Sequence, residues 1–194
     1  YLKDVPAPAK LDEGHLTPVN LSIDVLSVLE ISEVESYVQF QIELHLTWYD
    51  NRLTFKNLKK DRDLNALTTE ERDSIWIPAV TFFNTEQKSA SLNDPQSFVL
   101  IDRFGDFIRS SPTSLQNIHV FDGEQNSLTT SRVYSNKFIC NFDMAVYPFD
   151  TQRCSMQFAM NGNTGKFARL VRDRFQYLGP IDLTQYFVKG TNFT

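Results

Sequence analysis

The stretch VQFQIELHLTW, residues 38–48, decides the fold. Its alternate positions are apolar, and the positions between them are polar or charged, including Glu43 and His45. Because successive side chains of a strand point to opposite faces, this alternation predicts a β-strand with one buried face. The stretch is long for a strand, and such a length favours a tall sandwich in which two sheets pack face to face.

The same pattern appears on both sides of this stretch. Residues 19–25 alternate in the same way, and the acidic residues 30–36 between the two runs predict a hairpin-like connection. Thr68 and Glu71 have the spacing of a capping box and predict a short helical turn. Further strands are expected within residues 74–84, 97–102, 127–142, 153–160 and 182–190, and residues 3–18 are expected to form an entry loop. We therefore predict an all-β fold, an antiparallel immunoglobulin-like sandwich of about ten strands with one helical turn.

The composition limits the class of protein. The chain of 194 residues is 41% hydrophobic, which is enough for a core in one large domain, and its net charge of −5 argues against a nucleic-acid partner. No apolar run approaches the length of a membrane span, and no signal peptide is visible, so the chain is expected to be mature or trimmed.

The chain contains two cysteines, Cys140 and Cys154. In a cytosolic protein they would be buried free thiols, but Asn20 and Asn192 each begin a glycosylation sequon, which fits an extracellular chain. We therefore expect a Cys140–Cys154 disulfide, whose short ring contributes on the order of 3 kcal/mol by the chain-entropy estimate.

No pattern in the sequence indicates catalysis. The histidines, at positions 15, 45 and 119, lie on separate segments without metal-ligand spacing, and the sequence contains neither a glycine-rich phosphate loop nor a G-x-S-x-G elbow. We expect no enzymatic activity, no cofactor and no metal.

Several motifs resemble one family. The ring CNFDMAVYPFDTQRC, residues 140–154, resembles the signature loop of the Cys-loop receptors, which are pentameric neurotransmitter-gated ion channels. WYDNRL (48–53), IWIPAVTFFN (75–84) and SRVYSNKFIC (131–140) look like other family motifs, in family order, from about residue 19 to residue 190. The residues of these motifs look most like those of an invertebrate member of the nicotinic-like branch.

The resemblance implies that residues 1–194 are the extracellular ligand-binding domain of a channel subunit, without the final lid hairpin, its return strand and the transmembrane region. The partners would be identical or homologous subunits in a homo- or hetero-pentamer at the outer side of the cell membrane. The ring would couple ligand binding to the channel's transmembrane domain through Tyr147, Pro148, Phe149 and Asp150, with a cis Tyr147–Pro148 bond and with Glu30, Glu33 and Glu35 nearby.

The resemblance also locates an agonist pocket between subunits. Phe83 and Asn161 would lie on its principal face, and Glu43, Thr129 and Ser131, with Arg132 beside them, on its complementary face. Asn161 and Glu43 replace residues that are usually aromatic, and Ala79 replaces a usual aspartate. Because cation–π attraction is then mostly lost, weak acetylcholine binding is expected, and a polar amine is a candidate ligand.

Two alternatives remain open from the sequence. The first is a secreted soluble binding protein of the same fold without a channel. The second is an unrelated sandwich, such as a carbohydrate-binding module with a stapled hairpin. Apolar stretches of about twenty residues in the coding sequence after Thr194 would identify a channel.

Overall fold

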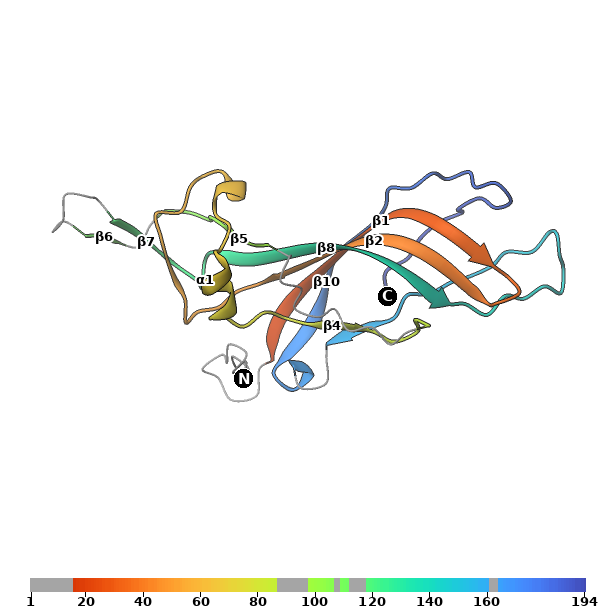
Figure 1. The fold of residues 1–194 in the computed structure, drawn as a ribbon, viewed down its shortest axis with the longest axis horizontal. Coiled ribbons are helices and arrows are strands. Elements are labelled where there is room, and N and C mark those ends of the chain that lie inside the picture. Colours follow the sequence, from red (N-terminus) through yellow and green to blue (C-terminus); the bar gives the residue numbers. More distant parts are fainter. Residues whose placement is uncertain (1–15, 87–97, 107–108, 112–117, 161–163) are drawn as a thin grey trace.

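The structure is a computed structural model that describes residues 16–86, 98–106, 109–111, 118–160 and 164–194. The molecule is elongated, and its longest strands run side by side along the long axis (Figure 1). In chain order the strands of the described residues are β1 (Thr17–Ser32), β2 (Tyr37–Trp48), β3 (Thr54–Lys56), β4 (Val80–Phe82), β5 (Val99–Asp102), β6 (Arg109–Ser111), β7 (Ile118–Asp122), β8 (Ser127–Ile139), β9 (Phe158–Met160) and β10 (Ala168–Tyr177). Short helices occur at η1 (Arg62–Leu64), α1 (Thr69–Asp73) and η2 (Thr164–Lys166).

One large sheet has the strand order β10-β1-β2-β8-β5. Its centre is the stretch quoted first, since β2 is antiparallel to β1 on one side and to β8 on the other. The pairing of β1 with β10 is parallel, which the sequence did not predict. Two smaller sheets, β3-β7-β6 and β4-β9, complete the predicted mostly-β, sandwich-type architecture.

Aromatic rings fill the space between the large sheet and the β4-β9 sheet. Phe82 of β4 lies edge-on to Phe138 and Tyr134 of β8, with ring centroids 6.1 and 5.1 Å apart. Trp48, at the end of β2, lies edge-on to Trp76. These contacts join the two layers, because such edge-to-face pairs are favoured beyond the area that they bury.

The helical turn forms as predicted. The hydroxyl oxygen of Thr68 accepts a hydrogen bond from the backbone N–H of Glu71, whose carboxylate accepts one from the backbone N–H of Thr68. This capping box satisfies donors that have no partner within a helix, and α1 follows directly.

The segment after β2 is held by a buried charge. The side chain of Asp50 is completely buried, and it accepts bonds from the backbone N–H and the guanidinium of Arg52. That pairing raises the pKa of Arg52. Gly123 lies against the same turn: a Cβ there would be 2.2 Å from the carbonyl oxygen of Asp50. The turn therefore leaves no space for a side chain at position 123.

Several details of the predicted elements were wrong. β1 continues to Ser32, where it still pairs with Tyr37 of β2, so the connection is shorter than residues 30–36. Residues 182–190 form no strand; they fold back on themselves, because the N–H of Leu183 bonds the carbonyl of Tyr186 and that of Val188 bonds the carbonyl of Ile181. Of the expected strand at 153–160, β9 covers 158–160. The predicted entry loop lies mainly outside the described residues, and its last positions, Thr17 and Pro18, begin β1.

Candidate functional site

Two residues expected on the complementary face, Glu43 and Ser131, lie with His45 on the polar face of the large sheet. His45 of β2 lies opposite Ser131 of β8 and opposite Ser22 of β1, while Glu43 lies opposite Asp24. Because side chains alternate along a strand, Glu43, His45 and Ser131 share the face that points away from the core. That face carries carboxylate, imidazole and hydroxyl groups, which can contact a polar or cationic ligand.

Thr129 and Arg132, the other residues expected on the complementary face, have different surroundings. The Thr129 hydroxyl is buried and donates a 2.7 Å hydrogen bond to the Asp102 carboxylate. Arg132 lies opposite Leu44, a core residue, and its guanidinium is 5.1 Å from the centroid of the Tyr134 ring. It therefore lies on the inner side of β8, on the opposite face from Ser131, rather than beside it.

Phe83 is the one residue expected on the principal face that lies within the described part of the chain. This residue directly follows β4, its side chain is 52% exposed, and its backbone N–H donates to the carbonyl of Gln157. Asn161, the other residue expected there, lies outside the described residues. An exposed phenyl ring beside a paired strand can present an apolar surface to a ligand or to a neighbouring subunit.

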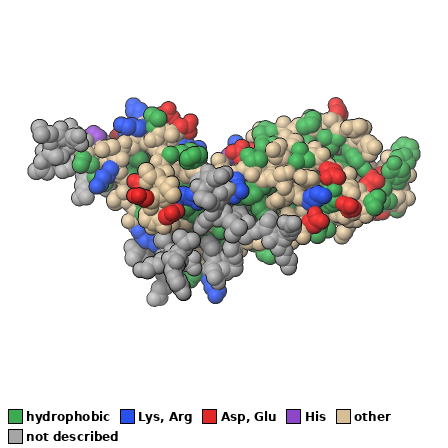
Figure 2. Space-filling model, in the orientation of Figure 1, with side chains coloured by type: hydrophobic (Ala, Val, Ile, Leu, Met, Phe, Trp, Pro, Cys, Tyr) green, Lys and Arg blue, Asp and Glu red, His purple; other side chains and the backbone are tan. Residues whose placement is uncertain are grey.

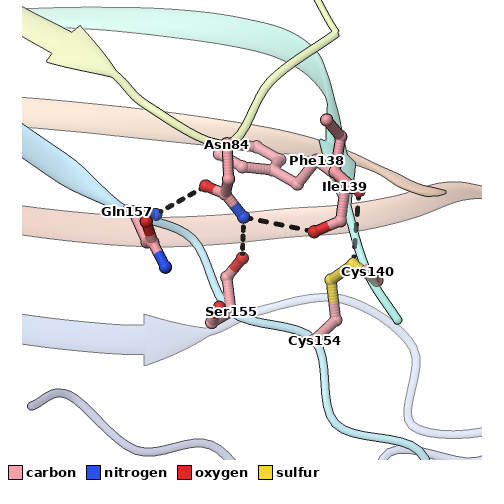
Figure 3. Close-up of a disulfide and its surroundings, with 7 residues drawn as sticks. All are labelled: Asn84, Phe138, Ile139, Cys140, Cys154, Ser155 and Gln157. Atoms are coloured by element: carbon pink, nitrogen blue, oxygen red, sulfur yellow. Dashed lines mark hydrogen bonds between the residues drawn. A yellow bond between two sulfur atoms is a disulfide. The ribbon is translucent and has the colours of Figure 1, made fainter. Parts of the chain in front are cut away.

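Asn84 connects the Phe83 segment to both ends of the disulfide ring (Figure 3). Its side-chain amide donates to the carbonyl oxygens of Ile139 and Ser155, at 3.3 and 2.7 Å, and its side-chain oxygen accepts from the backbone N–H of Gln157 at 2.9 Å. Ile139 precedes Cys140, and Ser155 follows Cys154. Asn84 was not singled out from the sequence, because its partners are 55 to 73 residues away in the chain.

The two cysteines form the predicted disulfide, with 5.2 Å between their Cα atoms. The Tyr147–Pro148 bond within the ring is cis, as expected. The ring is braced internally by Gln152, whose side chain bonds the backbone of Asp143 and the carboxylate of Asp150.

The tip of the ring is apolar and exposed. The exposed fractions of Val146, Tyr147 and Phe149 are 63%, 64% and 90%. The ring reaches the same end of the molecule as the β1–β2 turn (Figure 1), and the N–H of Cys140 bonds the carbonyl of Ser36 in that turn. Hydrophobic side chains are visible at this end (Figure 2). An apolar surface of this kind is typical of an interaction site.

Charged side chains lie beside the same end. Glu30 of β1 pairs with Gln39, which pairs with Lys137 of β8. The pKa of Lys137 is raised, first by its hydrogen bond with Tyr37 and also by the charges of Glu30 and Glu86. Glu33 and Glu35 lie in or next to the β1–β2 turn. The end of the molecule therefore combines an apolar tip with charged groups of both signs.

The two sequons differ in their surroundings. Asn20 lies within β1, where it is half-buried between Thr47 of β2 and Val171 of β10. Asn192 is exposed in the segment that follows β10.

Comparison with known proteins identifies the family. Residues 5–192 match the model of the neurotransmitter-gated ion-channel ligand binding domain. The chain is 22% identical to the serotonin-gated chloride channel mod-1 of Caenorhabditis elegans over 96% of the chain and 33% of that protein. It is 27% identical to gamma-aminobutyric acid receptor subunit pi of Bos taurus over 91% of the chain and 36% of that protein.

A third relative is acetylcholine receptor subunit alpha-type des-2 of Caenorhabditis elegans, 25% identical over 80% of the chain and 25% of that protein. Relatives named for serotonin, gamma-aminobutyric acid and acetylcholine support the family as a whole and not the nicotinic-like branch in particular. The chain spans 25–36% of the length of these relatives. The described residues include no helix long and apolar enough to cross a membrane. The chain belongs to the neurotransmitter-gated ion-channel ligand-binding domain family.

Proposed function

We propose that the chain is the extracellular ligand-binding domain of a pentameric channel subunit and that it couples a ligand between subunits to channel opening. The observation that carries this proposal is the connection made by Asn84. One side chain joins the segment of Phe83, the expected ligand-facing residue, to both ends of the disulfide ring, whose apolar tip is exposed. A displacement at Phe83 would therefore move the ring.

The ligand is proposed to be a polar amine. On the complementary face, the Glu43 carboxylate is 32% exposed, and the exposed Ser131 lies on the same face of the sheet. Phe83, with Asn161, would contribute the principal face of the neighbouring subunit. A carboxylate with one aromatic ring attracts an ammonium group, but it lacks the several rings that bind acetylcholine most strongly.

Assembly and location follow from the same proposal. Five identical or homologous subunits would form a closed heterologous ring, in which the face carrying Phe83 contacts the face carrying Glu43 of the next subunit. The ring would lie at the outer side of the plasma membrane, where the apolar tip at Tyr147, Pro148 and Phe149, with Asp150, would rest on the transmembrane domain. Asn20 and Asn192 are proposed as glycosylation sites.

A secreted binding protein without a channel is less favoured, because the relatives that match most of the chain are named as channels and receptors. That alternative also assigns no function to the exposed apolar tip.

The test is electrophysiology on cells that express the full-length subunit. Serotonin, betaine, gamma-aminobutyric acid and acetylcholine would each be applied to the wild type, to Glu43→Gln and to Glu124→Gln. We expect an amine-evoked current whose half-maximal concentration rises severalfold in Glu43→Gln and is unchanged in Glu124→Gln, which alters an exposed residue in the turn between β7 and β8. A submicromolar response to acetylcholine, or an equal response of both variants, would contradict the proposed pocket.

A further inference from the structure

A histidine and two carboxylates lie close together on the polar face of the large sheet. Asp24 of β1 and Glu43 and His45 of β2 each offer a ligand atom, and these atoms lie within 4.8 Å of one another. The Nε2 atom of His45 is 3.2 Å from Oδ2 of Asp24 and 3.9 Å from Oε1 of Glu43. From this geometry we propose that the three side chains form a binding site for a divalent transition-metal ion, Zn²⁺.

The register of β1 and β2 creates the charge that favours a cation there. Asp24 and Glu43 lie directly opposite each other in the antiparallel pair, and like charges in this arrangement are destabilising. Arg174 of β10 compensates the negative charge of Asp24, since its Nη2 atom is 2.6 Å from Oδ2 of that residue. Glu43 has a histidine as its neighbour instead. A divalent ion between the two carboxylates would remove their repulsion.

A second observation points independently to a ligand. The carboxylate of Asp24 is only 9% exposed, and its Oδ1 atom is buried without a hydrogen-bond partner among the described residues. Its other oxygen, Oδ2, already contacts both Arg174 and His45. Leaving a buried acceptor without a partner is unfavourable. A metal ion coordinated by Oδ1 would satisfy that atom and would leave the contact between Oδ2 and Arg174 in place.

The distances suit zinc. Zinc bonds to histidine nitrogen and carboxylate oxygen are about 2.0–2.2 Å long, so neighbouring ligands of a tetrahedral site are separated by about 3.4 Å. The Nε2 atom of His45 and Oε1 of Glu43 are 3.9 Å apart, close to this value. The 3.2 Å separation between His45 and Asp24 is measured to Oδ2, so a small rotation of the Asp24 carboxylate would be needed to bring Oδ1 to the ion. His45 and Glu43 are 23% and 32% exposed, so solvent can supply the fourth ligand.

The imidazole decides which ion is preferred. Calcium and magnesium bind almost entirely through oxygen, whereas nitrogen ligands favour zinc and its neighbours in the transition series. The sequence predicted no metal site because the three histidines lie on separate segments. The strand register instead places one histidine beside carboxylates from its own strand and from the next strand.

The site can be tested on the purified chain by calorimetric titration with ZnCl₂. We expect one Zn²⁺ per chain, and we expect His45→Gln and Glu43→Gln each to weaken binding at least about tenfold. His119→Gln is the matched control: it removes a histidine from β7, in a different sheet, and should leave the affinity unchanged. Both test residues lie on the polar face, so the core should be intact, and circular dichroism of each variant verifies this.

A second readout is the visible d–d absorption of bound Co²⁺, a spectroscopic substitute for zinc, which His45→Gln should abolish. The proposal would be overturned if Zn²⁺ did not bind, if both variants bound it as tightly as the wild type, or if Ca²⁺ bound equally well. The titration needs no amine and no channel, so its failure would leave the proposed receptor function untouched.

Discussion

Asn84 and Ser155 are 71 residues apart in the chain, and the side-chain amide of Asn84 donates a 2.7 Å hydrogen bond to the backbone carbonyl of Ser155. Since Ser155 adjoins Cys154, this bond fixes the end of the disulfide ring to the segment that carries Phe83. The same side chain holds the other end of the ring through Ile139.

Replacing Asn84 by alanine removes three hydrogen bonds at once. Because these groups lie near the surface, water can replace part of the loss, and we expect Asn84→Ala to lower the free energy of unfolding by about 1–3 kcal/mol. Chemical denaturation measures this change, and amide hydrogen exchange should show faster exchange at Gln157. The control is Asn51→Ala in an exposed turn. Equal stability and equal exchange in the two variants would show that the hydrogen bonds of Asn84 do not stabilise the fold.

Gly123 should not tolerate a side chain. An added Cβ would be 2.2 Å from the carbonyl oxygen of Asp50 and 2.9 Å from that of Leu53, so the backbone would have to move. We expect Gly123→Ala to destabilise the fold by at least about 1–3 kcal/mol. Gly190→Ala is the matched control, because a Cβ there meets nothing within 4 Å. Thermal unfolding compares the stabilities of the two variants. Equal melting temperatures would show that the turn at Gly123 can rearrange to accept a side chain.

The Cys140–Cys154 bond should contribute to stability as well as shape. We expect Cys140→Ser combined with Cys154→Ser to reduce the free energy of unfolding by about 3 kcal/mol, since the open chain regains entropy in the unfolded state. Urea unfolding of the oxidised wild type and of the double variant measures this loss. Peptide mapping that found free thiols in the wild type would contradict the disulfide itself.

The apolar tip should matter for function and not for folding. Phe149 is 90% exposed, so Phe149→Ser should leave the melting temperature unchanged, but it should greatly reduce the current of the full-length receptor without altering ligand affinity. Phe104→Ser, at a residue that is 74% exposed but lies outside the ring, is the control and should leave the current intact. Equal currents in the two variants would argue against coupling through the ring.

The sequence predicted those strands and helices that are determined by residues close together in the chain. The alternation of residues 38–48 predicted β2, and the capping box at Thr68 and Glu71 predicted α1. The parallel pairing of β1 with β10 and the small β3-β7-β6 sheet could not be read from the sequence, because they depend on contacts between distant segments.

The candidate site also combines residues that the sequence located with contacts that only the structure shows. Motif spacing located Glu43 and Ser131, which the register places on one face. It also placed Arg132 beside them, although strand alternation directs that residue to the other face. The partners of Asn84 and the proximity of Asp24 to His45 arise only when separate strands are brought together.

The proposed intersubunit site can be tested most directly by cysteine cross-linking in the full-length receptor. The central claim is that Phe83 of one subunit faces Glu43 of the next across the ligand, so Phe83→Cys combined with Glu43→Cys should join subunits when a short bis-maleimide that spans the width of a ligand is added, because a direct disulfide needs closer Cβ atoms. We predict a ladder of covalent oligomers up to the pentamer on a non-reducing gel, absent from either single variant. Exclusively monomeric bands from the surface-expressed double variant would contradict this account.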